Sequence, residues 1–533
     1  MKLTIKEASE YITKYLREEK GIEKDVKPSN ISYLIQYGRI SKIKNNNRLY
    51  ADIDELISYY NRTVVNKHND MLKRFGEDYN LKLAFANTTE KDRTKHVHRL
   101  HPYKGKFIPQ LVEYFIDNHT DSFKKQTFFD QDDIILDPFL GSGTTVVEGL
   151  ENGLNGIGID ISEFNCLLSE VKLHDYDTYQ LENAVNKIIE KLEENNNEQE
   201  DRYSIDLKEL VTEYNKKYFP SPEFKVKVQN NLLNEKDYSE KVIQNFNKDL
   251  NILKEKNNLN VIDNNNNNNM DTFMDLWLLP NVKKEAFDIK KIITSMNFDK
   301  AITNLFLVVL TKTVRSSRAT KHTDLATLKS PTRNPYYCKK HYKICTPVTS
   351  CLGKFKQYLR DTLNRVEEYQ NLKQNKEHAV IHGDSSTINI LEALKSKNSY
   401  LYDKAANNQI KGIFTSPPYL GVINYHEQHA YAYELLNIER YDDKEIGKLM
   451  DGKSKKAKNH YIESISNVFI NCKQYLADDF DIFIVANDDL NIYPEILKKA
   501  NLKIVQRFER PVLNRTERNK KLYTETIFHC KEG

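Results

Sequence analysis

The sequence lacks any run of apolar residues long enough to cross a membrane, and its 533 residues include only six cysteines. The first residues, Met1-Lys2-Leu3-Thr4-Ile5-Lys6-Glu7, contain no apolar segment of the kind that directs secretion. Six cysteines in so long a chain do not make a disulfide framework. We therefore expect a soluble, cytoplasmic protein with no membrane partner.

Paired Cys-x-x-Cys spacing is also missing. Cys338, His341, Cys345 and Cys351 are residue types that bind zinc, but without that pairing the sequence predicts no metal site. The formal net charge of +4 is only mildly basic and does not by itself indicate a nucleic-acid partner. Any DNA-binding surface must therefore be a local concentration of charge.

A glycine turn lies between two short apolar runs. Ile134-Ile135-Leu136 leads into Asp137-Pro138-Phe139-Leu140-Gly141-Ser142-Gly143-Thr144-Thr145, and the second run, Gly156–Ile159, ends at Asp160. Glycines let a ligand approach the backbone, a helix N-terminus offers free amides, and an acid about 20 positions later suits ribose hydroxyls. The further glycine of a nicotinamide fingerprint is absent, and no Gly-Lys-Ser/Thr closes a nucleoside-triphosphate loop.

A strand that stops at two prolines is the most informative feature. The apolar run Gly412–Thr415 is followed by Ser416-Pro417-Pro418-Tyr419. Because proline cannot continue a ladder and extends the residue before it, a hydroxyl, a stiff backbone and an aromatic ring meet at one sheet edge. That arrangement suits methylation of an exocyclic amine on a flipped-out base, although a loop of this composition could also occur by chance.

Together, the two segments resemble motifs I and IV of the amino-methylating DNA methyltransferases, which use S-adenosylmethionine. The stretch His101–Pro109 resembles the family segment that closes over the methionine end of the cofactor. Asp160 falls at the family's ribose-binding acid and Asp384 at its contact with the adenine amino group. The resemblance implies cofactor contacts from Tyr103, Lys106, Phe107, Asp137, Phe139, Gly141, Gly143, Thr144, Asp160 and Asp384.

The resemblance also implies the chemistry. Ser416 and the carbonyl of Pro417 or Pro418 accept hydrogen bonds from the amine, while Tyr419 stacks on the base. Ser-Pro-Pro-Tyr is typical of N4-cytosine enzymes, whereas N6-adenine enzymes more often begin the motif with Asp or Asn. No cysteine lies in the Pro-Cys pair of the ring-carbon methylases. His426 and His429 are candidate DNA or base contacts, or packing residues.

The fold class implied is an α/β Rossmann-like methyltransferase sheet with helices on both faces. Strands alternating with helices agree with it, and motif I preceding motif IV resembles the alpha-type order of the family. The expected domains are a winged helix-turn-helix module, a helical connector, the cofactor half of the methyltransferase, a mainly helical target-recognition insert and the catalytic half. Their expected bounds are 1–62, 63–95, 96–170, 171–377 and 378–533.

Three segments are candidates for DNA contact. Residues 1–62 resemble the winged helix-turn-helix modules of excisionase and MerR-type proteins, with Lys42, Lys44 and Arg48 on the wing; the alternative is a packing domain without DNA contact. A basic segment from Lys312 to Lys343 suits a loop that follows a DNA backbone, or a solvated surface. Its predicted contacts are Arg315, Arg318, Lys321 and Arg333. A third phosphate-binding candidate is the loop carrying Arg515, Arg518 and Lys520.

The favoured function is an N4-cytosine DNA methyltransferase acting on duplex DNA, partnered functionally by a restriction endonuclease. N6-adenine methylation is the alternative within the same class. A DNA-binding regulator with a silent methylase half is a second alternative, although motifs I and IV are both intact. An RNA substrate is a third. The Asn-rich run Asn264–Asn269 is low in complexity and is expected to be a loop tip without a functional signal.

Overall fold

The structure is a computed structural model, and contacts between residues divide the chain into two units. It describes residues 1–22, 24–45, 48–75, 82–85, 88–195, 202–257, 272–322, 328, 330–512 and 524–533. The first unit combines residues 1–79, 197–282 and 317–349, and the second combines 80–196, 283–316 and 350–533. The run Asn264–Asn269 and the loop with Arg515, Arg518 and Lys520 lie outside the described residues.

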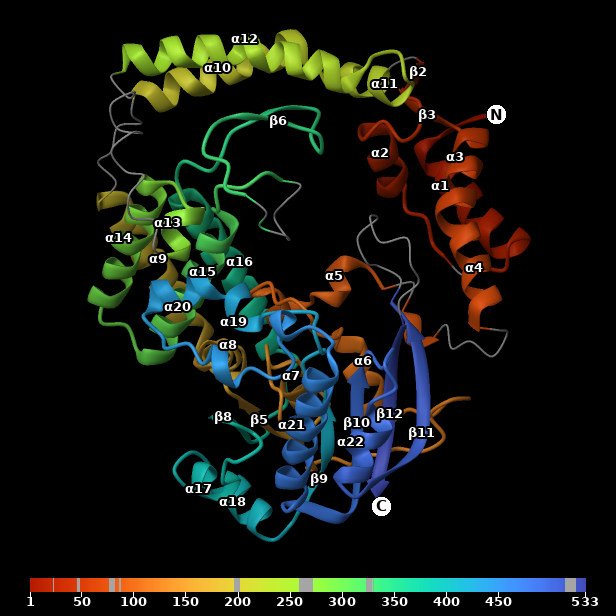
Figure 1. Ribbon diagram of the computed structural model, residues 1–533. Coiled ribbons are helices and arrows are strands. Elements are labelled where there is room, and N and C mark those ends of the chain that lie inside the picture. The colour runs from red at the N-terminus through yellow and green to blue at the C-terminus, as the bar shows by residue number, and fades with distance from the viewer. Residues whose placement is uncertain are drawn as a thin grey trace. The chain divides into compact units, whose positions relative to one another are not determined.

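The second unit is built on a seven-stranded mixed sheet (Figure 1). Its strand order is β11-β12-β10-β9-β4-β5-β8. The bounds are β4 Ile134–Asp137, β5 Asn155–Asp160, β8 His378–His382, β9 Ile410–Thr415, β10 Leu476–Ala486, β11 Leu502–Pro511 and β12 Thr524–Glu532. Strands β8, β5, β4, β9 and β10 run parallel, while β12 runs antiparallel to both β10 and β11. This α/β architecture is compatible with the predicted Rossmann-like methyltransferase fold.

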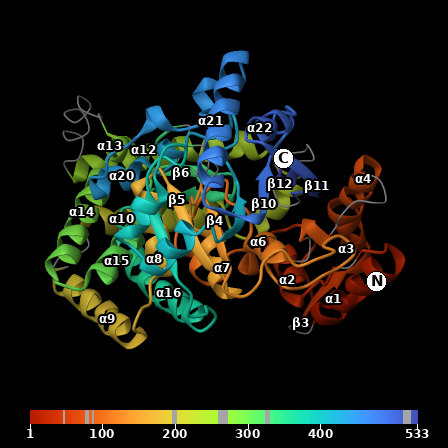
Figure 2. The ribbon, with the colours of Figure 1, turned by 90° about the horizontal axis from the view of Figure 1, so that it is seen from below.

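Both faces of the central strands β4, β9 and β10 are buried, and their side chains alternate between two apolar layers. On β9, Ile413 packs in one layer and Phe414 in the other; on β10, Ile482 and Phe483 divide the same way. Helices α17 (Ile390–Lys395), α18 (Ser399–Ala406), α21 (Lys455–Lys473) and α22 (Tyr493–Lys499) supply the first layer. Helix α6 (Pro109–Ile116) belongs to the second layer; Figure 2 shows α6 and α7 (Thr144–Glu151) across the sheet from α21 and α22. Near-continuous apolar strands such as these require cover on both sides.

The parallel register brings the ends of the central strands to one edge. Asp137 of β4 pairs with Gly158 of β5, and Asp160, the last residue of β5, pairs with His382 at the end of β8. Ligands of open α/β sheets bind at this carboxyl edge. The remaining helices of the second unit are α5 Glu90–Arg93, α8 Glu163–Leu173, α9 Thr178–Asn195, α14 Pro280–Ser295 (from Lys283 onward), α15 Lys300–Ser316, α16 Leu352–Gln370, α19 Tyr425–Gln428 and α20 Ala430–Leu436.

The N-terminal part of the first unit has its own small sheet and core. Its elements are β1 Lys2–Thr4, α1 Ile5–Lys14, α2 Pro28–Gln36, β2 Ile43–Asn45, β3 Arg48–Asp52, α3 Ile53–Tyr60 and α4 Asn66–Phe75. A capping box between Thr4 and Glu7 starts α1, and Pro28 at the first position starts α2. The β2–β3 hairpin lies where the sequence predicts the wing, but the helix-turn-helix assignment itself stays a prediction.

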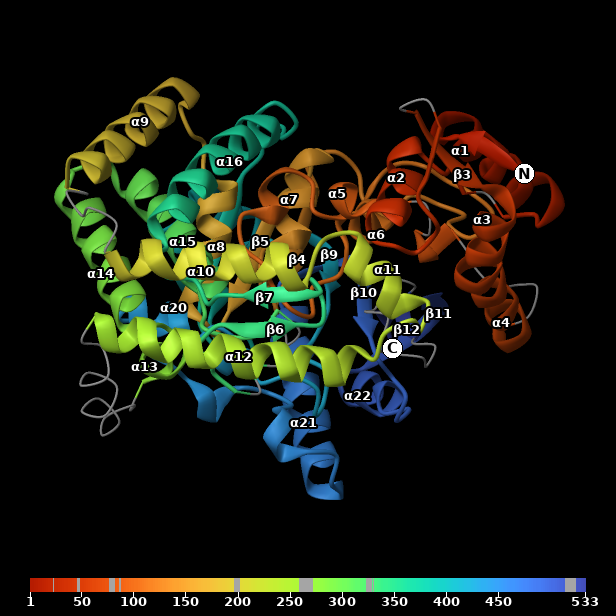
Figure 3. The same ribbon diagram turned by 90° about the horizontal axis from the view of Figure 1, so that it is seen from above.

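The rest of the first unit is a helical arm that carries a short hairpin. Its helices are α10 Arg202–Tyr218, α11 Glu223–Gln229, α12 Glu235–Lys256 and α13 Phe273–Trp277. The hairpin consists of β6 (Tyr336–Cys338) and β7 (Lys343–Cys345) and lies between the long helices, with β7 beside α10 and β6 beside α12 (Figure 3). The predicted insert 171–377 is thus shared between both units. Among the described helices, none combines the length and apolar character that crossing a membrane requires.

Candidate active site

A cavity opens at the carboxyl edge of the sheet, and all of its lining residues belong to the second unit. It encloses about 970 Å³, including its open mouth. The predicted cofactor residues that line it are Tyr103, Lys106, Phe107, Asp137, Phe139, Gly141, Thr144, Asp160 and Asp384. Ser416 and Pro418 of the proline motif line the same cavity. The structure therefore brings together two motifs that are far apart in the sequence.

The glycine turn is shaped by backbone that other residues rarely adopt. Gly141 has φ of +52° and Gly143 has φ of +76°. Gly143 caps the N-terminus of α7 and does not line the cavity; a Cβ there would lie 2.8 Å from the Ser169 hydroxyl. The Gly141 N–H donates to Asp160 Oδ2 at 2.7 Å, so this bond fixes the turn to the end of β5. Glycine is required here for packing as well as for ligand approach.

Asp160 is held by donors from three directions. Besides Gly141, its carboxylate accepts hydrogen bonds from the Ser162 N–H at 2.9 Å and from Asn165 Nδ2 at 3.0 Å. Burial raises the pKa of Asp160 to about 6, and these hydrogen bonds oppose that rise. Above that pH the group is a preorganised acceptor facing the cavity.

Two side-chain hydrogen bonds join the glycine turn to the strand that carries the proline motif. The Thr415 hydroxyl donates to Asp137 Oδ1 at 2.6 Å, and the Thr145 hydroxyl donates to the carbonyl of Phe414 at 3.1 Å. Burial raises the pKa of Asp137 to about 6, against the hydrogen bond from Thr415. Because these groups are buried, their bonds restrain the position of the next residue, Ser416, relative to the turn.

Hydrogen bonds from two tyrosines hold the backbone and the ring of the proline motif in place. Tyr461 donates its hydroxyl hydrogen to the carbonyl of Pro418 at 2.8 Å and lies 3.0 Å from the Tyr493 hydroxyl. Tyr419 donates to Glu525 Oε1 at 3.1 Å. Pro417 and Tyr419 are not among the residues that line the cavity, so the predicted stacking role of Tyr419 stays a prediction.

The lining of the cavity also includes residues that the sequence did not single out, among them Ser162, Asn165, Tyr425, Tyr433 and Glu445. The hydroxyls of Ser162 and Tyr433 form a buried hydrogen bond, and both backbone N–H groups at Tyr425 and His426 donate to Glu445. No motif in the sequence marks these residues, because their role depends on how α8, α19 and α20 come together.

His426 and His429 both line the cavity and both are buried. His426 Nδ1 lies 2.7 Å from the Tyr433 hydroxyl. Burial, reinforced by the nearby Arg315, lowers the pKa of His429 to about 3, and burial also lowers the pKa of His426. Both rings are therefore neutral at physiological pH and act as packing or hydrogen-bonding groups, not as cations.

Three polar atoms of the lining are left without a partner among the described residues. They are Ser142 Oγ, Thr144 Oγ1 and Asn165 Oδ1, and each is fully shielded from solvent. Buried polar atoms without hydrogen bonds are costly, at about 1–3 kcal/mol each, so their grouping in one cavity indicates a polar ligand. Thr144 is the first residue of α7, where free backbone amides also favour an anionic group.

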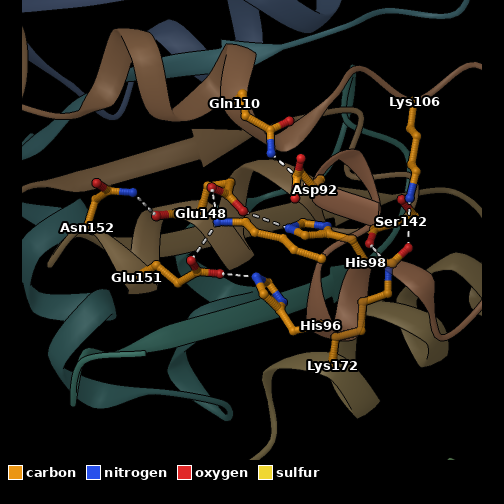
Figure 4. A network of polar contacts seen from close by, with 11 residues as sticks. Asp92, His96, His98, Lys106, Gln110, Ser142, Glu148, Glu151, Asn152 and Lys172 are labelled. Carbon is orange, nitrogen blue, oxygen red and sulfur yellow. Dashed lines mark hydrogen bonds and ion pairs between the residues drawn. The ribbon is translucent and has the colours of Figure 1, made fainter. Parts of the chain in front are cut away.

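Next to the cavity, a buried network of charges braces helix α7 (Figure 4). Lys95 Nζ lies 3.0 Å from Glu148 and 2.7 Å from Glu151, while His98 contacts Glu148 at 2.7 Å and His96 contacts Glu151 at 2.8 Å. Burial opposes the charge on Lys95, but Glu148 and Glu151 together raise the pKa of Lys95. We call these five residues the lysine cluster.

The lysine cluster is bonded to the segment His101–Pro109, which the family resemblance places over the cofactor. Lys106 lines the cavity, and its Nζ donates to the carbonyl of His98 at 2.8 Å. Burial lowers the pKa of Lys106 to about 8. Lys172 Nζ donates in the same way to the carbonyl of Ser142 in the glycine turn. Buried lysines thus tie residues 98–106 and the turn to the protein interior.

The predicted DNA contacts are distributed over both units. Lys42, Lys44, Arg48 and Lys321 are exposed. Arg318 is only 6% exposed, and the half-buried Arg333 donates to the carbonyl of Asp275 at 2.6 Å. Arg315 lies in the last turn of α15, in the second unit.

Lys312 opens the basic segment, but its side chain turns into the interior of the second unit. Its Nζ donates to the carbonyl of Arg99, and burial lowers the pKa of Lys312 to about 8. Lys312 is therefore a structural residue in this fold.

Comparison with known proteins agrees with this geometry. A family model described as DNA methylase, of the N6/N4 type, matches residues 4–171. The type II methyltransferase M.MjaII of Methanocaldococcus jannaschii is 45% identical over 529 residues, which is 99% of this chain and 96% of that protein. The chain belongs to this family of type II DNA methyltransferases, the methylases of restriction-modification systems.

Two further relatives match over shorter stretches. The type II methyltransferase M.MvaI of Kocuria varians is 35% identical over 119 residues, or 22% of this chain and 24% of that protein. M.BsoBI of Geobacillus stearothermophilus, another type II methyltransferase, is 33% identical over 116 residues, or 21% of each chain.

Proposed function

We propose that this protein transfers a methyl group from S-adenosylmethionine to the N4 amine of a cytosine that has swung out of duplex DNA. The observation that carries the proposal is the bond between Thr415 and Asp137, which links the strand of Ser416 to the turn that faces the cofactor cavity. The Ser-Pro-Pro-Tyr form of the motif favours cytosine.

The cavity residues fit the proposed cofactor. Asp160 would accept hydrogen bonds from the ribose hydroxyls and Asp384 from the adenine amine, while Phe139 would contact the adenine ring. Ser142, Thr144 and Asn165, whose polar atoms have no partner among the described residues, would receive the amino-acid end, together with the amides at the start of α7. When bound, S-adenosylmethionine supplies an electrophilic methyl group.

The residues of the proline motif would orient the target amine. Ser416 Oγ accepts one N–H, and the carbonyl of Pro417 or Pro418 accepts the second; the Pro418 carbonyl also accepts from Tyr461 and keeps a second lone pair for the amine. Two accepted hydrogen bonds aim the nitrogen lone pair at the methyl group. Tyr419 would stack on the ring, and the proton leaves late in the reaction. Most of the acceleration then comes from positioning.

Cofactor affinity should depend on pH through Asp160. The pKa of this carboxyl is raised to about 6, and only its ionised form accepts hydrogen bonds from both ribose hydroxyls. A ligand that binds the ionised form binds more tightly as pH rises through 6, so affinity should increase between about pH 5 and pH 7 and then level off. Titration calorimetry at several pH values measures this, and an unchanged dissociation constant would contradict the role of Asp160.

Contacts with duplex DNA are assigned to Lys42, Lys44 and Arg48 of the N-terminal module and to Arg315, Lys321 and Arg333; Arg318, which is only 6% exposed, would have to move to join them. A cognate restriction endonuclease is the proposed functional partner. The alternative substrate is the N6 amine of adenine, since the same backbone could present either base to the methyl group. A silent DNA-binding regulator and an RNA methylase remain as outcomes of the test below.

The deciding experiment incubates the purified protein with unmethylated DNA of varied sequence and methyl-labelled S-adenosylmethionine, followed by nucleoside mass spectrometry. We expect N4-methylcytosine. Detection of N6-methyladenine would support the site but show that the target base is adenine. Label in RNA alone would show that the substrate is RNA. No methylated base in either nucleic acid would leave only the regulator.

Two variants test the assignment of Ser416. Ser416→Ala should lower kcat about 100-fold, by analogy with the loss of one hydrogen-bonding group that acts in a transition state, while binding of the cofactor is unchanged. Ser464→Ala is the matched control, because this hydroxyl bonds the His460 carbonyl within α21 and does not line the cavity. Equal activity of the two variants would rule out the role of Ser416.

A further inference from the structure

Four residues of the first unit bring nitrogen and sulfur atoms together around the β6–β7 hairpin. They are His322, Cys338, His341 and Cys345, and one donor atom from each lies within 4.8 Å of all the others. Cys338 ends β6, Cys345 ends β7, His341 lies in the turn between them, and His322 comes from the preceding segment. The two cysteines are buried and His322 is half-buried. We call these four residues the hairpin cluster.

The spacing of the donor atoms fits one metal ion. His322 Nδ1 lies 3.7 Å from Cys338 Sγ, and His341 Nδ1 lies 3.4 Å from Cys345 Sγ. In a tetrahedral zinc site with Zn–S of about 2.3 Å and Zn–N of about 2.05 Å, a nitrogen and a sulfur ligand are about 3.6 Å apart. The two measured separations lie on either side of that value. Two cysteines and two histidines are also a ligand set of structural zinc sites.

The turn between the strands is folded around the first sulfur. The backbone N–H groups of His341 and Tyr342 both donate to the carbonyl of Cys338, at 3.1 and 2.7 Å. Tyr342 has φ of +54°, a conformation that closes the turn tightly. The two hydrogen bonds fix the turn that carries His341 next to Cys338.

His322 has a second polar neighbour. The Tyr336 hydroxyl lies 2.8 Å from His322 Nδ1 and accepts a hydrogen bond from the backbone N–H of His322 at 2.9 Å. A metal ion on Nδ1 would replace the first contact, while the second would remain to hold His322 beside the hairpin.

The hairpin is too small to hold itself together. Each strand has three residues, and the apolar cluster within the hairpin comprises only Tyr336, Cys338 and Cys345. An isolated two-stranded hairpin is at best marginally stable in water. Asn215 of α10 brackets Ile344 with two hydrogen bonds, and Tyr337 bonds Glu235 of α12. These contacts, together with the packing of Ile344 into the apolar core of α10 and α12, attach the strands to the arm. A metal ion would add a direct link between the turn and His322.

We propose that His322, Cys338, His341 and Cys345 bind one structural zinc ion, which fixes the β6–β7 turn and His322 to each other. Binding displaces the protons of the two thiols, so that two thiolates and two neutral imidazoles complete the coordination. The ion would also order the adjacent basic residues, Lys321 beside His322 and Lys339 and Lys340 in the turn. The proposal does not depend on which base is methylated, and it departs from the sequence-based expectation of no metal.

Three of the four ligands were among the residues that the sequence analysis named as zinc-binding types. The fourth residue named there was Cys351, which lies in the second unit at the start of α16, where its backbone N–H bonds Glu285. The fourth position is taken by His322, which precedes Cys338 by 16 residues. Its pairing depends on tertiary packing that places His322 beside the hairpin, and spacing alone does not reveal that.

The test measures metal in the full-length protein, purified without chelator and dialysed, by inductively coupled plasma mass spectrometry. Wild type and Cys351→Ser should each contain about one zinc per chain, as a single four-ligand site requires, and Cys338→Ser should lose most of it. Cys351→Ser is the matched control because it removes a buried thiol outside the hairpin cluster. Zinc retained equally in all three proteins would overturn the proposal.

A second measurement does not depend on the folding of a variant. Wild-type protein stripped of metal and titrated with Co²⁺ should develop the strong visible bands of tetrahedral cobalt and a thiolate-to-cobalt charge-transfer band, saturating at one equivalent. Zinc should then abolish both. Weak octahedral absorption without a thiolate band, together with zinc content near zero in the untreated protein, would refute the site.

Discussion

The two units each gather two histidines and two groups that can carry negative charge, yet the two clusters are completed in different ways. In the lysine cluster, Lys95 lies within 3.0 Å of both carboxylates, so the cation is part of the chain. In the hairpin cluster the corresponding groups are thiols, and the four donor atoms surround a point that a metal would occupy. Two clusters with the same number of donor groups therefore differ in function. Where a lysine lies among the donors it neutralises them, and where no lysine does, a metal ion can bind.

This difference should separate the conditions on which each unit depends. The lysine cluster should respond to substitution and pH, whereas the hairpin cluster should respond to metal supply. Trp277, the only tryptophan of the chain, is buried in the first unit and reports on that unit by its fluorescence. Binding of S-adenosylmethionine is the corresponding readout for the second unit.

The largest effect is expected from Glu148→Ala. The substitution leaves His98 without its carboxylate partner and leaves Lys95 with Glu151 alone, and breaking a buried pair costs about 3–5 kcal/mol. Urea unfolding followed by circular dichroism should show the loss, and cofactor binding should weaken with it. The Trp277 transition and the zinc content should not change. A coincident loss of zinc would mean that the two clusters are not independent.

Removal of zinc should come next in size. A ligand at 100 to 1,000 times its dissociation constant stabilises the folded state by about 3–4 kcal/mol, and chelation removes that contribution. The urea midpoint seen by Trp277 fluorescence should fall after treatment with a chelator and recover when Zn²⁺ is restored. Cofactor binding by the second unit serves as the internal control. An unchanged Trp277 transition would show that a metal ion does not stabilise the first unit.

Lys95→Met should destabilise by about 2 kcal/mol at pH 8, less than Glu148→Ala because the lysine side chain is 21% exposed. Burial already raises the pKa of Glu148, and loss of the lysine raises it further. A carboxyl with a raised folded-state pKa contributes stability at low pH that is lost as pH rises through that pKa. The variant should therefore lose less relative to wild type at pH 5 than at pH 8, as measured by thermal unfolding. An equal loss at both pH values would show that Lys95 does not neutralise Glu148.

The smallest effect is expected from Tyr337→Phe, at about 1 kcal/mol, the typical net value of one hydrogen bond. The substitution removes the bond to Glu235 that ties β6 to α12, but it leaves the four metal donors in place. Zinc content should stay at one per chain while the Trp277 transition shifts slightly. Tyr179→Phe, at a side chain that is 73% exposed, is the control. If Tyr337→Phe abolished zinc binding, the hairpin would depend on α12 and not on the metal.

The sequence was most informative where chemistry and strand ends coincide. Asp137, Asp160 and Ser416 were each placed at the end of an apolar run, and parallel pairing brings those ends to one cavity. Tyr425 and Tyr433 could not be predicted in this way, because they reach the cavity from short helices whose packing no local pattern encodes.

The organisation of the chain was harder to predict. Residues 171–377 were expected to form one insert, yet contacts assign α9, α15 and α16 to the unit that holds the sheet. Apolar periodicity shows that a helix is buried but not against which partner it packs. Arg318 illustrates the same limit, because a basic residue in a basic segment is buried here.

The bond between Thr415 and Asp137 joins two strands that the ribosome makes far apart in time. The two residues are 278 positions apart, and β4 pairs directly with β9. At about 5–20 residues per second, a ribosome needs roughly 14–56 s to make the intervening chain. During that time one edge of β4 has no native neighbour, and an unpaired strand edge invites wrong pairing. The nascent protein is therefore exposed to misfolding until the proline motif has been made.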